Sequence, residues 1–368
     1  MHDDRIVIEN RIRKTLRERI EPAVYPRSEP LAVEIWRVPA EQSPASELVG
    51  EPVPVADALA ADYEAAASGQ AWGPPWATVW WRVRGTVPAA WRGKTVEAVF
   101  DLGFDGDWPG FQCEGLAYRP DGTVVKALNP SNQWLRVTDQ AAGGEEVLYY
   151  VEAAANPTIK GPISDKGDRV AADSAPLYRL GRMDLVVFDD TVWELARDVE
   201  VLDGLMRELS LESPRRWEIL HGLNRALDAL DLDDVNASAG QVRDALAPLL
   251  RAPAAVHAHR VTAVGHAHID TAWLWPQRET VRKVARTASN VTALMDDHPD
   301  FVFAMSQAQQ LAFYRSTHSP AITRPLIAAA ESEATQTIRD NFVQPTLNAL
   351  GYTLNQFVLS WAPAAAKH

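Results

Sequence analysis

The sequence predicts an α+β fold of several domains, in which an antiparallel β-sandwich is followed by a helical connector and by the first unit of a parallel β/α domain. Short β-rich runs separated by turn signals fill much of the first half of the chain. Two helical segments with apolar faces follow them, and a strand–helix–strand pattern begins near residue 256. At roughly 100–200 residues per domain, a chain of 368 residues has room for two or three domains.

The composition excludes several classes of protein. The formal net charge is −13 at pH 7, which opposes non-specific binding to nucleic acid. The chain contains no apolar run long enough to span a membrane, and its N-terminus lacks the pattern of a signal peptide. The single cysteine, Cys113, cannot form an internal disulfide, which fits a reducing compartment. We therefore expect a cytoplasmic protein that binds neither nucleic acid nor a membrane.

Residues 1–64 are expected to form an N-terminal helix and an extended arm. Apolar side chains recur every four residues over 8–20, with charged residues between them. This spacing predicts an amphipathic helix that packs on a more C-terminal part of the chain. Residues 26–60 are rich in proline and lack a clear period, so we interpret them as an extended arm.

The β-sandwich is predicted for residues 65–203, with strands continuing to about residue 200. Its β-rich runs are separated by turn signals such as Asp105-Gly106, Gly143-Gly144 and the hairpin sequence 119–123. Most of the 13 tryptophans lie between residues 72 and 134. Large aromatic rings in such runs usually belong to the core. Sugar stacking is the alternative interpretation.

Residues 204–255 are predicted to form the helical connector, and residues 256–314 the βαβ unit. One connector helix carries Trp217, Leu220, Leu223 and Leu227 on one face, and a second ends at Pro253. Buried parallel strands are expected at 261–264 and 301–305, with a helix over 279–296 between them. A single unit leaves strand edges open, so we expect a homo-oligomer or disorder after residue 255.

The residues with the clearest chemical potential follow the first parallel strand. Residues 266–270 read His-Ala-His-Ile-Asp. On an extended strand end, His266, His268 and Asp270 project to the same side. Imidazole and carboxylate groups are suitable ligands for zinc or a similar divalent ion. Either His266 and His268 form the ligand pair, as in amidohydrolase-type barrels and TatD-like deoxyribonucleases, or His268 and Asp270 do so with His266 outside the ligand set.

The sequence around this motif resembles one family. The stretch GHAHIDTAWLWP and its continuation from Glu279 to Gln310 are similar to the first strand–helix–strand of the family 38 α-mannosidases, and most similar to the cytosolic and vacuolar branch. Upstream, WGPPWATVWWRVRGTVPAAWRGKTV and VEAAANP resemble the β-sandwich that precedes the catalytic domain in that branch. The resemblance covers most of residues 1–310. It implies that a (β/α) barrel-like glycosidase domain begins near residue 256.

The same resemblance implies an activity and roles for single residues. The family removes terminal α-mannosyl residues from mannose-containing oligosaccharides with retention of configuration, using a metal that is usually zinc. His268 and Asp270 match the first two metal ligands, and Co²⁺ is an alternative ion. Trp273 matches the aromatic side chain that lies against the mannose ring. His266 would take an outer role, donating a hydrogen bond to a ligand.

The resemblance does not extend to the catalytic carboxyl groups. A retaining glycosidase needs two of them about 5–5.5 Å apart, and in this family both lie well downstream. Residues 315–368 are expected to be a divergent tail, whose lone aspartate, Asp340, fits no family motif. We therefore expect a truncated α-mannosidase that has no catalytic residue of its own and is inactive alone. Two alternatives stay open: an amidohydrolase-like metal hydrolase using His266 and His268, and a non-catalytic carbohydrate-binding module built on the tryptophan-rich sandwich.

Overall fold

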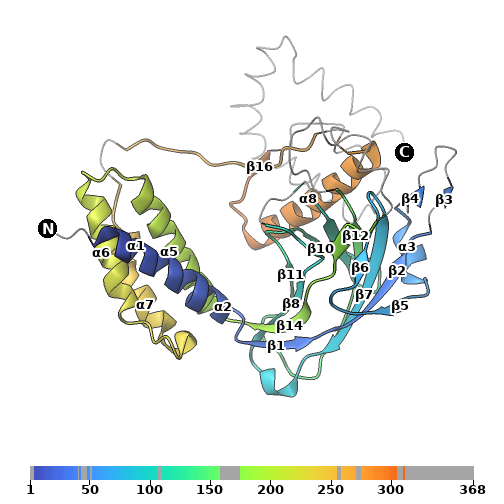
Figure 1. Cartoon of the computed structure of the whole chain (residues 1–368), viewed down its shortest axis with the longest axis horizontal. Helices are drawn as coiled ribbons and strands as arrows, with labels where there is room; N and C mark the ends of the chain where they lie inside the picture. Colours follow the sequence, from blue (N-terminus) through green and yellow to red (C-terminus); the bar gives the residue numbers. More distant parts are fainter. Residues whose placement is uncertain are drawn as a thin grey trace, which may run out of the picture.

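The computed structural model describes residues 4–39, 41–42, 48–49, 52–106, 110, 112–157, 175–254, 258–270, 275–304 and 310. Figure 1 shows a group of helices on one side, a β-sandwich on the other, and a long helix, α8, lying over the sandwich. None of the described helices has the length and apolar character that crossing a membrane requires.

Two antiparallel sheets form the sandwich. The order of the four-stranded sheet is β1-β14-β8-β11, and that of the six-stranded sheet is β10-β9-β12-β7-β2-β5. The strands are β1 (Arg27–Pro30), β2 (Ala32–Arg37), β5 (Glu64–Ala66), β7 (Thr78–Thr86), β8 (Thr95–Phe100), β9 (Glu114–Tyr118), β10 (Val124–Leu128), β11 (Trp134–Thr138), β12 (Glu146–Ala154) and β14 (Met183–Phe188). The antiparallel sandwich predicted from the sequence is confirmed.

Short elements complete this part of the chain. Two small antiparallel pairs lie outside the main sheets, and two short helices connect strands. They are β3 (Glu41–Gln42) with β4 (Leu48–Val49), β6 (Ala71–Trp72) with β13 (Tyr178–Arg179), α3 (Val55–Leu59) and the 3₁₀ helix η2 (Ala89–Trp91). The predicted turn at 119–123 is confirmed: Gly122 has a positive φ of 82°, and it joins β9 to β10.

Side chains alternate between the two faces of the six-stranded sheet. In β7, Val79, Trp81 and Val83 point into the core between the sheets, whereas Trp80 points to the outer face. Trp72 and Trp91 also belong to the inner core. All four tryptophan side chains are at most 4% exposed, so they cannot stack on a sugar. For these residues the interpretation as core is confirmed.

The expectation of an extended arm at 26–60 was wrong. Within that range, β1 pairs with β14, and β2 pairs with both β7 and β5. The reason is visible in Val33 and Ile35, which alternate with polar residues and are buried in the inner core. The prolines lie between the paired segments or, as Pro30, at the last residue of an edge strand, where a missing N–H is tolerated.

The strand expected near residue 200 was also wrong, because this segment is the helix α5 (Asp190–Glu208). The side chain of Asp189 caps its first turn by accepting a hydrogen bond from the backbone N–H of Val192. Apolar residues then recur at helical spacing and are buried: Val192, Leu195, Ala196, Val199, Leu202 and Met206. This period outweighs the β propensity of the valines.

The helices at the left of Figure 1 share a second core. They are α1 (Arg5–Thr15), the π-helical turn η1 (Leu16–Ile20), α2 (Glu21–Ala23), α5, α6 (Pro214–Leu227) and α7 (Val235–Leu250). The predicted N-terminal helix and both connector helices are confirmed. Ile8, Ile12 and Ile20 pack against α5–α7, as the i+4 spacing predicted. Buried Arg216 donates to three carbonyl oxygens at the end of α5 and pairs with Glu9 at 3.0 Å.

The predicted helix after the His-Ala-His-Ile-Asp motif is confirmed as α8 (Gln277–Asp297). The strands that flank it are much shorter than expected. β15 (Gly265–His266) pairs in parallel with β16 (Phe303–Ala304), as predicted. Residues 261–264 are not a buried strand, since Val261 is 86% exposed. Within the described part of the chain, no further strand joins this pair to bury it. Self-association through these edges stays a prediction.

Candidate functional site

Helix α8 packs on the outer face of the six-stranded sheet, chiefly against β10. An apolar cluster lies at this contact. It contains Trp80, Leu116, Tyr118, Ala127 and Tyr150 from the sheet, with Ile269, Val284, Ala285 and Ala288 from the βαβ unit. The sandwich is therefore the platform on which the His-Ala-His-Ile-Asp segment and its helix are built.

The burial of Ile269 determines the direction of the side chains on either side of it. It is 8% exposed and belongs to the cluster on the sandwich. Because successive side chains of an extended segment alternate, His268 and Asp270 both face away from the sandwich core. Their side chains meet, with His268 Nε2 at 3.2 Å from Asp270 Oδ1. The structure thus brings these two predicted ligands together.

The other predicted site residues lie elsewhere or outside the described part of the chain. His266 Nδ1 is 2.9 Å from the carbonyl oxygen of Ala304, and its ring stacks on Phe303. The imidazole of His266 therefore contacts the neighbouring strand β16. Trp273 lies outside the described residues. Trp275, interpreted as a core residue, is half-buried and lines a pocket.

The pair His268–Asp270 fits one edge of a zinc site. Two ligands of a tetrahedral zinc ion, each about 2.0–2.2 Å from the metal, are separated by about 3.4 Å. The observed N–O separation of 3.2 Å is close to this value. The side chains are 81% and 39% exposed, so both are open to an incoming ion. Among the described residues, no group of three or more His, Cys, Asp or Glu side chains could complete the site.

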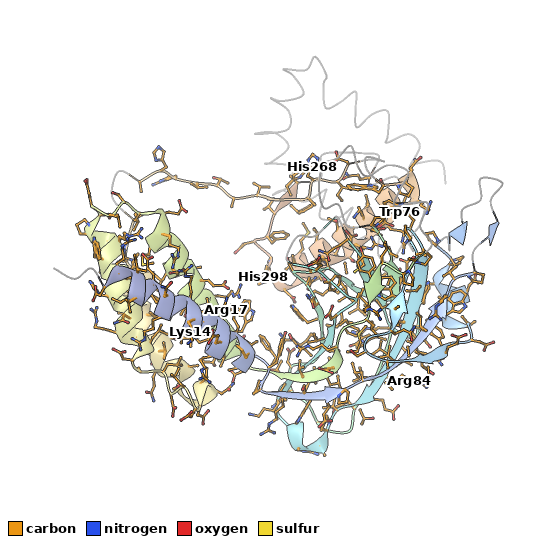
Figure 2. All side chains as sticks on the ribbon, viewed as in Figure 1. Lys14, Arg17, Trp76, Arg84, His268 and His298 are labelled. Carbon is orange, nitrogen blue, oxygen red and sulfur yellow. The ribbon has the colours of Figure 1, made fainter. Side chains whose placement is uncertain are left out.

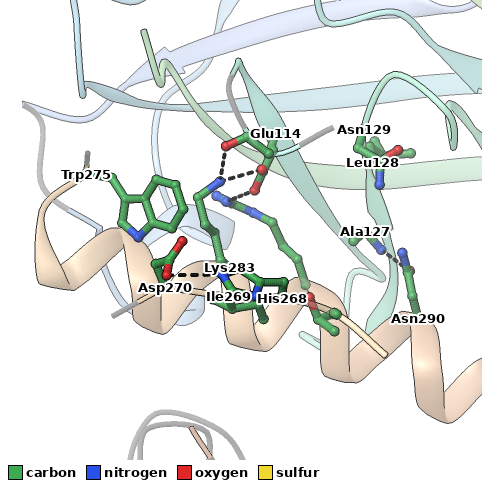
Figure 3. Close-up of a pocket in the computed structure, with 14 residues that line it drawn as sticks. Glu114, Ala127, Leu128, Asn129, His268, Ile269, Asp270, Trp275, Lys283 and Asn290 are labelled. Atoms are coloured by element: carbon green, nitrogen blue, oxygen red, sulfur yellow. Dashed lines mark hydrogen bonds and ion pairs between the residues drawn. The ribbon is translucent and has the colours of Figure 1, made fainter. Parts of the chain in front are cut away.

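A pocket of about 740 Å³ adjoins the pair, and Figure 3 shows its lining. One wall comes from β9, β10 and the residues around them, and the other from the motif and α8. The lining residues are Gly110, Glu114, Ala127, Leu128, Asn129, Ala267, His268, Ile269, Asp270, Trp275, Lys283, Arg286, Thr287 and Asn290. Figure 2 places His268 beside α8, well away from the helices that carry Lys14 and Arg17.

A network of buried charges joins α8 to the sandwich beneath this pocket. Glu114 on β9 accepts from Lys283 at 2.6 Å and from Arg286 at 2.5 Å. Arg286 also donates to Glu279 at 2.5 Å, which in turn accepts from Asn156 at 2.7 Å. The charged members of the network are Glu114, Glu152, Glu279, Arg282, Lys283 and Arg286, all at most 7% exposed. Three acids balance three bases, so the network is neutral.

Charge attraction inside this network outweighs the cost of burial. Burial raises the pKa of Glu279, but Arg286, Arg282 and Lys283 together lower it to about 2. Burial lowers the pKa of Arg286, and Glu279, Glu114 and Glu152 more than offset this, so that its pKa lies above its usual range. Glu279 and Arg286 therefore stay ionised at neutral pH. Removing one of them would leave its partners buried without compensation.

The apolar spacing over residues 279–296 predicted the buried face of α8 but not this network. The signal was present, because Glu279, Lys283 and Arg286, with Arg282, recur at i, i+3, i+4 and i+7. That spacing places them along one side of a helix. The partner Glu114 lies within residues 65–203, the range predicted for the β-sandwich. Nothing in the sequence alone indicates which charged side chain of the sandwich meets α8.

Two family models match the chain. The model for the α-mannosidase jelly roll domain matches residues 29–186, and the model for the N-terminal domain of glycosyl hydrolases family 38 matches residues 258–358. The first range includes the strands from β2 to β13, among them most of the sandwich, and the second includes His268, Asp270 and α8. The second match also continues into residues 315–358, which lie outside the described part of the chain.

Curated relatives agree with these models. Human α-mannosidase 2C1 is 34% identical over 277 residues, covering 74% of this chain and 25% of the relative. α-Mannosidase G of Dictyostelium discoideum is 26% identical, covering 69% and 23%. α-Mannosidase of Saccharomyces cerevisiae is 26% identical, covering 70% and 24%. The chain spans about a quarter of the length of these relatives.

The similarity of this chain to solved structures is weak and gives no information about the site. The β-glucuronidase of Ruminococcus gnavus is 14% identical, with a TM-score of 0.26 over 45% of this chain and 29% of its own. The family assignment rests on the two family models, which together match the sandwich and the βαβ unit. The chain thus belongs to the family 38 α-mannosidases, of which it contains the jelly-roll domain and the N-terminal region of the glycosyl hydrolase domain.

Proposed function

We propose that this chain supplies the first part of the active site of a retaining α-mannosidase, which hydrolyses terminal α-mannosyl residues of mannose-containing oligosaccharides. His268 and Asp270 would hold the metal, zinc or another divalent ion such as Co²⁺. One observation carries the proposal: the two side chains meet at 3.2 Å, in the region that matches the family 38 model. Trp273 is proposed to lie against the mannose ring.

The residues of the site have separable roles in this proposal. A divalent ion at His268 and Asp270 would supply Lewis-acid binding of sugar hydroxyl groups. Ile269 anchors the pair by its burial against the sandwich. His266 stays outside the ligand set and supports the segment through its contact with Ala304. The second ligand pair and the two carboxyl groups of the retaining mechanism are proposed to lie outside residues 1–368.

The domain organisation proposed for this function follows the three structural units. The sandwich, from β1 to β14, carries the βαβ unit on its outer face. The helices α1 and α5–α7 form a separate unit. The βαβ unit, near residues 256–314, is proposed to be the first unit of a (β/α) barrel-like domain. The cytoplasmic location stays a prediction, as does the divergence of residues 315–368.

The two alternative functions find less support. The amidohydrolase-like hypothesis requires His266 and His268 to form a ligand pair. The imidazole of His266 instead contacts Ala304 on β16. The carbohydrate-binding module needs exposed tryptophans on the sandwich, whereas four of them are buried. Substitution of His266 by Ala separates the first alternative from our proposal: metal binding is lost if His266 is a ligand and is only weakened if it is not.

We expect purified residues 1–368 to release no p-nitrophenol from p-nitrophenyl α-mannoside above the uncatalysed rate, with or without added Zn²⁺. The reason is that the nucleophile and the acid/base are expected outside this chain. The assay is a colorimetric time course with a mannosidase of known activity as positive control. Release that depends on the metal and is absent from the Asp270→Ala variant would contradict the expected inactivity.

We expect residues 1–368 to bind Zn²⁺ or Co²⁺ only weakly, in the micromolar range, because two ligands rarely hold zinc well. Metal content by mass spectrometry after dialysis against the metal is the measurement, and binding should disappear in His268→Ala and Asp270→Ala. His298→Ala is the matched control, since His298 follows the far end of α8. Equal metal content in His268→Ala and the wild type would overturn the assignment of the site.

A further inference from the structure

A continuous set of contacts links the sandwich to the backbone of Asp270. The hydroxyl of Thr280, a fully buried residue, lies 3.4 Å from the carbonyl oxygen of Asp270 and donates to it. The same hydroxyl oxygen accepts a hydrogen bond of 3.0 Å from Nε1 of Trp275. Thr280 therefore ties the first turn of α8 to the residue that we propose as a metal ligand.

Lys283 continues the set of contacts towards the sandwich. Its ammonium nitrogen lies 4.8 Å from the centre of the Trp275 ring, a distance typical of a cation–π contact. The same nitrogen donates to the Glu114 carboxylate at 2.6 Å and to the Gly110 carbonyl at 2.9 Å. Figure 3 shows the end of the Lys283 side chain between Glu114 and the ring of Trp275.

We propose that Thr280, Trp275 and Lys283 are positioning residues for Asp270. Glu114 holds Lys283 in place, so the N-terminal sandwich contributes to the geometry of the metal site. This proposal rests on the proposed function, since it requires a metal at His268 and Asp270. It goes beyond that function because it gives a role in metal binding to a residue of the jelly-roll domain, which lies more than 150 positions before the ligands in the sequence.

Stability alone is a weak reason for such an arrangement. The apolar cluster around Ile269 already holds the βαβ unit on the sandwich. Buried ion pairs add little net stability over apolar residues of similar size, and their better-attested use is to specify one geometry. Here the polar contacts reach the carbonyl oxygen of Asp270 through Thr280. Apolar side chains can shift relative to one another and stay in contact. Hydrogen bonds require a defined distance and direction, so they fix the position of a backbone atom.

The test compares Thr280→Val with Thr292→Val in the full chain. Both variants remove one hydroxyl from α8, but the hydroxyl of Thr292 donates only within the helix, to Ala288 at 2.8 Å. We expect Thr280→Val to weaken Zn²⁺ binding about tenfold, in the range seen for residues that orient metal ligands. It should also speed amide hydrogen exchange in residues 265–270. Thr292→Val should match the wild type in both, and Thr280→Ser should restore both.

A second variant tests the contribution of the sandwich. Lys283→Met removes the cation beside Trp275, while Glu114 keeps its contact with Arg286. We expect it to change Zn²⁺ affinity and exchange in the same direction as Thr280→Val, with an unchanged circular dichroism spectrum. If Thr280→Val and Lys283→Met both behave like Thr292→Val, the positioning role is wrong.

Failure of the proposed function gives a different result. In that case the wild type binds no more Zn²⁺ than His268→Ala, and the exchange data alone decide the positioning role. Faster exchange at 265–270 in Thr280→Val and Lys283→Met would still support a role in ordering the segment. Unchanged exchange in both variants would overturn it.

Discussion

Substitution of Glu279 by Gln is expected to lower the free energy of unfolding by about 3–5 kcal/mol, the range for breaking a buried ion pair. Glu279 is 2% exposed and contacts Arg286 at 2.5 Å and Arg282 at 3.4 Å. Gln has nearly the same shape but no charge, so both guanidinium groups lose an anion without gaining water. Urea unfolding followed by tryptophan fluorescence measures the change.

Glu146→Gln is the matched control, because Glu146 is exposed on β12 of the same sandwich. Its effect should stay within about 0.5 kcal/mol, as for surface substitutions generally. A loss below 1 kcal/mol in Glu279→Gln would contradict the interpretation that the buried charges depend on one another. We expect the lost stability to weaken the contact between α8 and the sandwich. Amide hydrogen exchange in residues 277–297 should therefore become faster first.

The same carboxyl group predicts a dependence on acid. The pKa of Glu279 lies at about 2, below its ordinary value of 4.5, because attraction by Arg286, Arg282 and Lys283 exceeds the effect of burial. A lowered pKa contributes stability that is fully present above pH 4.5 and is lost as the pH falls towards 2. The difference in stability between the wild type and Glu279→Gln should therefore shrink over this window. A difference that stays constant from pH 6 to pH 2.5 would contradict it.

The second large effect is expected from Trp80→Ala, which should cost about 3–5 kcal/mol by leaving a cavity in a packed cluster. The side chain of Trp80 is fully buried on the outer face of the six-stranded sheet, in the cluster that contains Ile269 and α8. Its loss should loosen the βαβ unit and speed exchange in residues 265–270. Chemical denaturation and hydrogen exchange together measure both parts of the effect.

Trp81→Ala is the natural comparison, because the neighbouring ring points to the inner core instead. We expect a similar loss of stability, spread over both sheets, with the sandwich strands rather than α8 losing protection. If the two variants show the same pattern of exchange, the outer cluster does not unfold separately from the sandwich core. In that case the βαβ unit and the sandwich behave as one cooperative unit.

The tryptophan-rich sandwich has a structural role in this interpretation. Its inner tryptophans fill the space between the sheets, and its outer face carries the segment with His268 and Asp270. The domain is then a support for the proposed metal site. A free sugar-binding surface is not required to explain why the sequence has so many large aromatic residues.

Much of the architecture could be predicted from local patterns. Alternating residues and turn signals indicated the sandwich, and the i+4 repeat of Ile8, Ile12 and Ile20 indicated a helix that packs on later helices. Where local patterns failed, two tendencies competed. In 190–208, valines favoured a strand while the spacing of apolar residues favoured a helix, and the packing against α6 and α7 decided.

Local sequence patterns were enough to indicate the residues that we propose as metal ligands. A histidine and an aspartate two positions apart, after an extended segment, share a side because the period of a strand is two. The contacts that hold this segment in place are visible in the folded structure alone. Ile269 is buried on a sheet formed far earlier in the chain, and Thr280, Lys283 and Glu114 meet there. Such contacts depend on which faces pack together, and local sequence patterns do not encode the partner of a buried charge.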